Sequence, residues 1–211
     1  MKKWLLATLV LPVSLMAEPL VVQYSSFYSH VRKLQDEDTN ALQFAFGFKK
    51  VQSKDLCHIN SAYIHTQKVD IDLTVSAEQR FTVPSEKALK QARAEVILDL
   101  QEPANKCDMS VQLETKPDWL KTDYSAPELK KLYTQYQAFF DDMGSFLSFL
   151  MPTVQGITVH FSDHQLNYDI DIGDQLKITA GKLDLSQEWI ANNQGLTLPV
   201  KPLRITAIVD K

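Results

Sequence analysis

The chain has 211 residues, of which 45% are hydrophobic and 23% are charged. This length is enough for one medium domain or two small ones, each with its own core. The formal net charge is −4 at pH 7, and the only acidic run is Asp36, Glu37 and Asp38. A chain without a basic patch is not expected to bind nucleic acid.

The N-terminal residues 1–17 are typical of a secretory signal peptide. Lys2 and Lys3 precede an apolar stretch from Trp4 to Met16, and the small Ala17 stands at a plausible cleavage point. This stretch is shorter than the ~20 residues that span a bilayer. We therefore predict export to the bacterial periplasm and a mature protein without a transmembrane segment, whose net charge is −6 once both lysines are removed. An uncleaved N-terminal anchor is the alternative.

Residues 18–116 are expected to form a β-rich domain. Residues 41–49 alternate cleanly, with Leu42, Phe44, Phe46 and Phe48 on one face, which is the pattern of a half-buried strand. Further strands are expected at 19–23, 56–66, 69–75, 80–83, 94–100 and 107–115, and a short helix at 24–34. In the strand over 69–75, the expected inward residues are Val69, Ile71, Leu73 and Val75. Short strands at this spacing predict a small antiparallel sandwich or curled sheet.

Cys57 and Cys107 are the two cysteines of the chain. An even pair in an exported protein favours one disulfide. The bond would close a loop of about 51 residues and contribute on the order of 4 kcal/mol to stability. Two free buried thiols are the alternative, and the spacing excludes a CxxC redox or zinc motif.

A long amphipathic helix is predicted over 127–151, after a linker at 117–126. Ser125 and Glu128 form a capping box, and Pro127 stands in the first turn. Apolar residues recur at steps of three and four and form one stripe: Leu129, Leu132, Tyr136, Phe139, Met143, Phe146 and Leu150. Lys130, Lys131, Gln135, Asp142 and Ser145 fall outside the stripe. The region 152–211 is again β-rich and is expected to pack on this helix.

The end of the helix carries an excess of apolar residues. It provides a possible surface for a partner, a lipid or a second copy of the chain: Met143, Phe146, Phe149, Leu150 and Met151. The alternative is that these side chains pack against one or both β regions.

The sequence contains no recognisable catalytic or metal-binding motif. His160 and His164 are four residues apart with Asp163 between them, but a strand end and a turn would not present them together. Asp169, Asp171 and Asp174 depart from the order of a calcium loop, and with Asp70 and Asp72 they fit the outward positions of strands. We therefore assign no catalytic residue, cofactor or metal ligand, although carboxylates that are distant in sequence can still meet in space.

The segments CHINSAYIHT, FTVPSEKALK, AEVILD and CDMSVQLETK lie between Cys57 and Lys116, and YSSFYSHVRKL lies at residues 24–34. Together they resemble the proteobacterial family designated domain of unknown function 2987. The resemblance covers most of the mature chain and is less distinctive after Pro152. It implies an exported protein with this cysteine pair, and it brings no activity, cofactor or catalytic residue.

We predict an α+β protein, with a sandwich-like β-rich region, one long amphipathic helix and a second small β-rich region. The expected function is that of a non-enzymatic periplasmic binding or envelope-accessory module. A first alternative is a soluble periplasmic hydrolase with a carboxylate or histidine site between the two β regions. A second is a protein that binds a lipid or an envelope partner through the apolar end of the helix.

Overall fold

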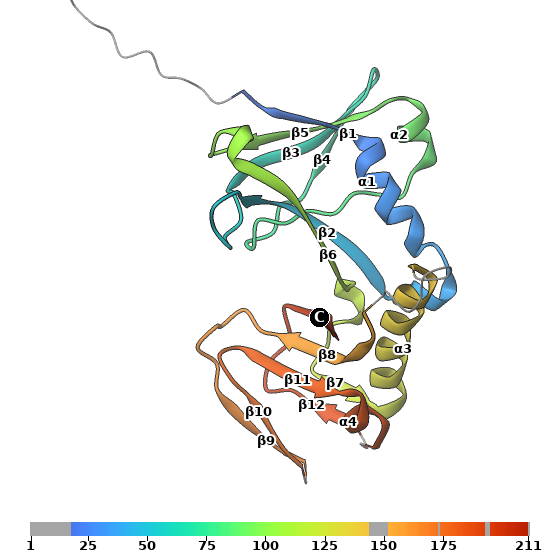
Figure 1. Ribbon diagram of the computed structural model, residues 1–211, viewed down its shortest axis with the longest axis vertical. Helices are drawn as coiled ribbons and strands as arrows, with labels where there is room; N and C mark the ends of the chain where they lie inside the picture. The colour runs from blue at the N-terminus through green and yellow to red at the C-terminus, as the bar shows by residue number, and fades with distance from the viewer. Residues whose placement is uncertain (1–17, 144–151, 173, 193–194, 211) are drawn as a thin grey trace, which may run out of the picture.

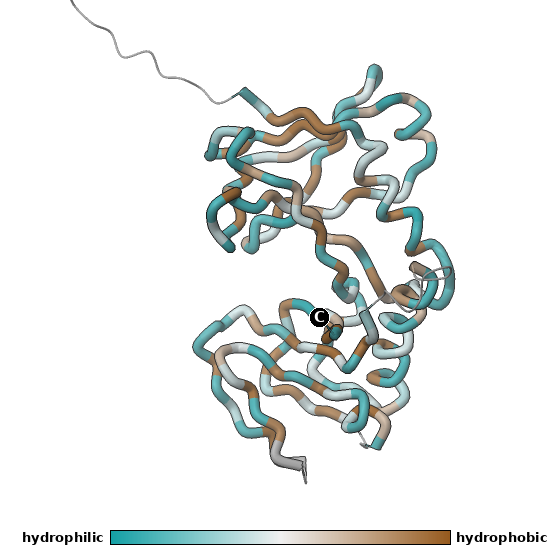
Figure 2. The backbone as a smooth tube through the Cα atoms, viewed as in Figure 1, coloured by the Kyte–Doolittle hydropathy of each residue, from teal (hydrophilic) through white to brown (hydrophobic). Residues whose placement is uncertain are grey.

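The computed structural model describes residues 18–143, 152–172, 174–192 and 195–210. In this part of the chain, strands and helices form an upper and a lower region, and β2 and β6 run from the first into the second (Figure 1). Hydrophobic positions concentrate on the strands, while the outer loops are hydrophilic (Figure 2). The predicted α+β class is confirmed, but the sheets do not close into a sandwich.

The upper region begins the chain. Its elements are β1 (Leu20–Gln23), α1 (Tyr24–Val31), η1 (Arg32–Leu34), η2 (Glu37–Thr39), β2 (Leu42–Lys50), β3 (Ile59–His65), β4 (Asp70–Leu73), α2 (Lys87–Gln91), β5 (Glu95–Leu100), η3 (Ala104–Lys106) and β6 (Cys107–Thr115). Four strands form one antiparallel sheet in the order β1-β5-β3-β4, and β2 pairs with β6 in a second one. Helix α1 packs on this second sheet, where the rings of Phe27 and Phe46 meet edge to face at 5.0 Å.

The lower region contains η4 (Pro117–Trp119), β7 (Asp123–Ser125), α3 (Ala126–Met143), β8 (Val154–His160), β9 (Tyr168–Ile172), β10 (Asp174–Ile178), β11 (Lys182–Ser186), α4 (Gln187–Asn192), β12 (Gly195–Thr197) and β13 (Arg204–Val209). Its largest sheet has the order β11-β8-β13. The lower region also contains two two-stranded sheets, the hairpin of β9 with β10 and the long-range pair of β7 with β12. The range predicted as a linker therefore contains a short paired strand. No helix in the described ranges is both long and apolar enough to cross a membrane.

Helix α3 joins the two regions. One of the two bonds of the capping box is present, since Ser125 N–H donates to the Glu128 carboxylate at 2.9 Å, and the Ser125 hydroxyl donates to the same carboxylate at 2.7 Å. On its buried face, Tyr136 donates to Ile205 O at 2.6 Å and lies 3.0 Å from Thr115 Oγ1. The stripe residues that the structure describes are buried up to Phe139, and Met143 is 42% exposed.

Two expectations about side-chain burial are wrong. Gln135, predicted on the polar face of the helix, is buried, because its amide binds the turn before β2 by accepting from Ala41 N–H at 2.6 Å and donating to Asn40 Oδ1 at 2.8 Å. Val69 and Ile71, predicted to point inward, are 58% and 37% exposed. The reason is that β4 is an edge strand of its sheet, paired with β3 alone.

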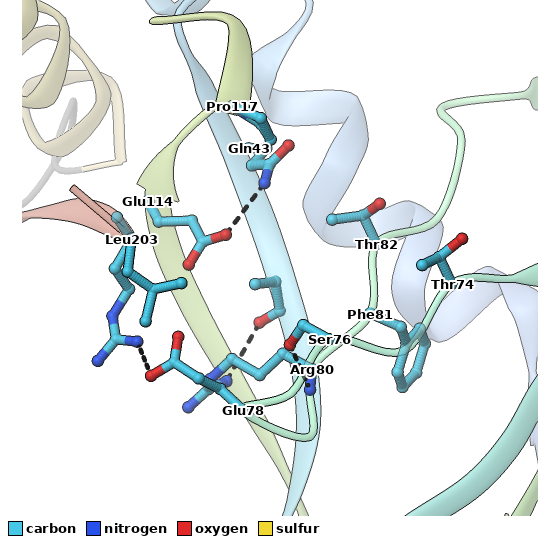
Figure 3. Close-up of a pocket in the computed structure, with 12 residues that line it drawn as sticks. Gln43, Thr74, Ser76, Glu78, Arg80, Phe81, Thr82, Glu114, Pro117 and Leu203 are labelled. Atoms are coloured by element: carbon cyan, nitrogen blue, oxygen red, sulfur yellow. Dashed lines mark hydrogen bonds and ion pairs between the residues drawn. The ribbon is translucent and has the colours of Figure 1, made fainter. Parts of the chain in front are cut away.

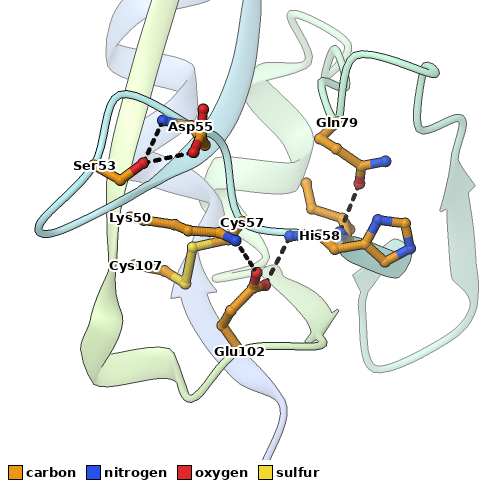
Figure 4. The surroundings of a disulfide bond; sticks show 9 residues. Lys50, Ser53, Asp55, Cys57, His58, Gln79, Glu102 and Cys107 are labelled. Carbon is orange, nitrogen blue, oxygen red and sulfur yellow. Dashed lines mark hydrogen bonds and ion pairs between the residues drawn. A yellow bond between two sulfur atoms is a disulfide. The ribbon is translucent and has the colours of Figure 1, made fainter.

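The predicted disulfide is present between Cys57 and Cys107, whose Cα atoms are 6.2 Å apart. It ties the segment before β3 to the start of β6 (Figure 4). Beside it, Glu102 forms an ion pair with Lys50 at 2.8 Å and accepts the His58 N–H at 2.8 Å. The cysteine pair is therefore enclosed by further contacts between the same segments.

Candidate functional site

A pocket of about 290 Å³ lies where the upper region meets β13. We call it the charged pocket because two glutamates and two arginines line it. Strands β2 and β6, the loop between β4 and α2, and the start of β13 form its walls (Figure 3). Its lining residues are Gln43, Ala45, Thr74, Ser76, Glu78, Arg80, Phe81, Thr82, Glu114, Pro117, Leu203 and Arg204.

The small residues of β2 allow the loop to approach. Gln43 and Ala45 of β2 line the pocket, and Gly47 follows them on the same face of the strand. A Cβ atom at Gly47 would lie 2.9 Å from the Gln79 carbonyl oxygen, which is too close for an ordinary contact. Gln79 itself has a φ of 59°, which is uncommon for a residue other than glycine. Its side chain stabilises this conformation by accepting the Ile59 N–H at 2.7 Å.

A tight turn then presents the two charged residues of the loop. Ser76 N–H donates to Arg80 O at 2.7 Å, and Gln79 N–H donates to Ser76 O at 2.9 Å. Arg80 N–H also donates to Ser76 Oγ at 3.2 Å. Glu78 and Arg80 are thereby held over the polar face of β2 and β6.

The charges of the pocket come from both regions. Glu78 of the loop forms an ion pair with Arg204 of β13, and the two side chains are only 28% and 17% exposed. Glu114 of β6 accepts from Gln43 Nε2 at 3.0 Å. Both carboxylates thus already have a partner within the protein.

The arginines retain more capacity to bind than the carboxylates. Arg204 Nε is buried, and in the part of the chain that the structure describes it has no hydrogen-bond partner. Arg80 donates through Nη1 to the Ala45 carbonyl at a long 3.4 Å. A buried donor without a partner is costly, so this pocket favours a ligand that brings an acceptor, above all an anion.

Burial also perturbs the titration of the pocket. It raises the pKa of Glu114, and the hydrogen bond from Gln43 and the nearby Arg204 and Arg80 only partly offset this effect. Glu114 therefore holds its proton to a higher pH than a free glutamate. A protonated Glu114 makes the pocket more positive, which favours an anionic ligand.

His160 lies behind the pocket, opposite Arg204 in the pairing of β8 with β13. Burial first, and then the charge of Arg204, lower its pKa to about 4. Its ring nitrogen Nε2 lies 2.9 Å from Thr206 Oγ1. His160 is thus a neutral group that supports the strand at physiological pH.

The surface predicted at the end of the long helix falls mostly outside the described residues. Phe146, Phe149, Leu150 and Met151 belong to 144–151, which the structure does not describe. Met143 lies close to η1, where the Nζ atom of Lys33 is 3.1 Å from the Met143 sulfur. The prediction for this surface therefore stays a prediction.

The other acidic and histidine residues considered from the sequence do not converge on the pocket. His65 and Asp70 are 2.7 Å apart, but both side chains are more than half exposed at the end of β3 and β4. Asp169 pairs with Lys177 at 3.6 Å, and the side chains of Asp171 and Asp174 lie outside those described. Within the described ranges, the potential ligand atoms that gather most closely belong to Cys57, Glu102 and Cys107, and the two sulfurs there are bonded to each other.

The model of the family described as Protein of unknown function (DUF2987) matches residues 16–161. The chain belongs to this family, as its sequence indicated. The match includes the whole upper region, α3 and β8, and it ends before Arg204. Neither a curated protein nor a solved structure matches the chain.

Proposed function

We propose that the protein is an exported periplasmic binding module, whose charged pocket holds an anionic group of its ligand. The proposal depends on the arginine pair of the pocket, in which Arg204 Nε is buried and has no partner among the residues that the structure describes. The leader-like residues 1–17 and the disulfide support an oxidising compartment outside the cytoplasm. Carboxylates and phosphates are the anions that a guanidinium binds best.

Calorimetric titration of the purified protein with small carboxylates and phosphates tests this binding role. Arg80→Gln should weaken a bound anion by roughly tenfold or more, since a hydrogen bond to a charged group contributes about 1.5–3 kcal/mol. Arg32→Gln changes an exposed arginine outside the pocket and serves as the matched control. Equal affinity in all three proteins would contradict the assignment of the pocket.

The same titration at different pH values tests the role of Glu114. Because burial raises the pKa of Glu114, binding of an anion should strengthen as the pH falls toward that pKa. Glu114→Gln, which is always neutral, should bind at least as tightly and lose this dependence. An unchanged pH profile in the variant would rule out Glu114 as the source.

Export is tested separately by fractionating bacterial cells that express the full chain. We expect the protein in the periplasmic extract, with a mature N-terminus at Glu18. A protein retained in the membrane with an intact leader would instead support the uncleaved anchor.

A periplasmic hydrolase is the second candidate, favoured by the presence of Glu78 and Glu114 in one pocket. A carboxyl group with a raised pKa can act as a general acid. In that case Glu114→Gln would abolish turnover of a hydrolysable substrate while leaving binding intact. Binding through the apolar helix end, to a lipid or an envelope partner, is the third candidate, and it depends on residues 144–151.

A further inference from the structure

A second cavity of about 220 Å³ lies next to the charged pocket. We call it the apolar pocket after five of its nine lining residues, Val31, Leu34, Leu42, Phe44 and Val83; the other four are Gln43, Thr82, Ser85 and Lys116. Gln43 and Thr82 border both cavities. The two pockets therefore meet at β2, with the charged pocket on the face of Gln43 and the apolar pocket on the face of Phe44.

The edge of β2 between the pockets has unpaired backbone groups. Phe46 exchanges two backbone hydrogen bonds with Phe81, at 2.8 and 2.9 Å. Residues two apart in a strand direct their N–H and C=O groups to the same edge, so Phe44 directs its groups to the side of Thr82. Among the described residues, no backbone group there bonds to Phe44.

The geometry of this edge selects an extended polypeptide as its ligand. An extended backbone supplies a donor and an acceptor at the spacing that Phe44 presents. The side chains of an added strand alternate between the two faces of the sheet. The residue opposite Phe44 would therefore enter the apolar pocket, and its neighbour would point to the charged pocket.

We propose that an extended segment of a partner protein adds to the edge of β2 at Phe44, with an apolar residue in the apolar pocket and an adjacent acidic residue in the charged pocket. This proposal rests on the proposed function and names its ligand. The acidic residue follows from charge complementarity, because the cationic donors of the charged pocket are on Arg80 and Arg204, and Arg204 Nε has no partner among the described residues, while both carboxylates are already bound. The five apolar lining residues of the apolar pocket can pack around a branched aliphatic side chain.

The test uses the full mature chain and the blocked peptide acetyl-Thr-Glu-Val-Glu-Thr-amide, titrated by calorimetry. A matched peptide with lysines in place of the glutamates should bind at least tenfold more weakly. N-acetylglutamate methylamide serves as a probe that can reach the charged pocket but cannot form a strand. We expect the pentapeptide to bind at least tenfold more tightly than this small compound.

Backbone methylation of the peptide then tests strand addition without altering the protein. The neighbours of β2 at β6 and Phe81 run antiparallel to it, and in the same arrangement the valine N–H faces the Phe44 carbonyl. N-methylation of the valine should weaken binding at least tenfold, and N-methylation of a glutamate by less than threefold. Equal effects at the two positions would overturn strand addition.

Hydrogen exchange gives an independent readout at Phe44. Its amide should exchange rapidly in the free protein and become protected at least tenfold by the peptide. The amide of Ala45 faces β6, so its exchange should not change. Protection of neither amide at saturating peptide would overturn the proposal.

The remaining outcomes separate this inference from the function on which it rests. If N-acetylglutamate methylamide binds as tightly as the peptide, the charged pocket is a ligand site but strand addition is wrong. If neither probe binds, the proposed anion site fails as well. A chain that self-associates without peptide, and protects Phe44 in doing so, would make a second copy the occupant and overturn a separate partner.

Discussion

The upper and lower regions are stabilised by different kinds of bond. A disulfide links two segments of the upper region, and the aromatic rings of α1, β2 and the segment around Phe81 fill its interior. The lower region contains no cysteine, and buried tyrosines of α3 fix its strands by hydrogen bonds. Tyr133 donates to Val154 O at 3.0 Å, and Tyr136 donates to Ile205 O. The upper region is thus covalently constrained, whereas the lower region is stabilised by non-covalent contacts, among them the hydrogen bonds from α3.

Removing the disulfide is expected to give the largest loss of stability. Cys57→Ala combined with Cys107→Ala should lower the free energy of unfolding by about 4 kcal/mol, because the bond closes a loop with a sequence separation of 50 and restricts the unfolded chain. Urea unfolding of the double variant and of the oxidised wild type measures this difference. Reduced wild-type protein is the control and should resemble the variant. A loss below about 1 kcal/mol would show that packing alone stabilises the upper region.

Tyr136→Phe is expected to have an intermediate effect that reaches both regions. The hydroxyl is fully buried, and it contacts Thr115 of β6 and Ile205 of β13. Its loss leaves the Ile205 carbonyl without this donor, which should cost about 1–3 kcal/mol. Thermal unfolding measures the loss, and Tyr168→Phe, at a site where the side chain is 49% exposed, is the control.

If the two regions unfold together, Tyr136→Phe should shift one common transition. Fluorescence and circular dichroism would then report the same midpoint. Two separated transitions in the variant, with only the later one sensitive to reductant, would instead show that the tyrosine couples otherwise independent units.

His160 is expected to give the smallest effect, confined to acidic pH. Its folded pKa of about 4 lies below the ordinary value of 6.5, so the unfolded chain binds a proton first as the pH falls. Stability should therefore decrease between about pH 6.5 and 4, by about 1–2 kcal/mol after allowance for partial exposure to solvent. His160→Gln should remove this slope in urea unfolding, whereas His58→Gln, at an exposed site, should retain it.

Local patterns predicted much of the upper region. The alternation over 41–49 identified β2, and the pair Ser125 and Glu128 identified the start of α3, because strand period and helix capping depend on neighbours in sequence. The disulfide was predictable from the even number of cysteines and the leader-like residues 1–17. Pattern alone could not show that β4 is an edge strand, so the burial of Val69 and Ile71 was wrongly predicted.

The charged pocket could not be predicted from local sequence patterns. Its charges come from positions 78, 80, 114 and 204, and no spacing in the sequence connects Glu78 with Arg204. Gln135 was misplaced for a related reason, since its partners precede β2. A usable signal was present in β2 and β6, where Gln43 and Glu114 occupy the face opposite the phenylalanines, but that pattern equally describes a solvent-exposed face.

The ion pair between Glu78 and Arg204 spans 126 residues. During synthesis the ribosome makes Glu78 early and Arg204 in the last strand of the described chain. The upper region can form much of its core before the later strands are added, but the charged pocket acquires its fourth charged residue, Arg204, only with β13. Binding by this pocket would therefore require a chain that extends through β13, and fragments ending before β13 would lack Arg204.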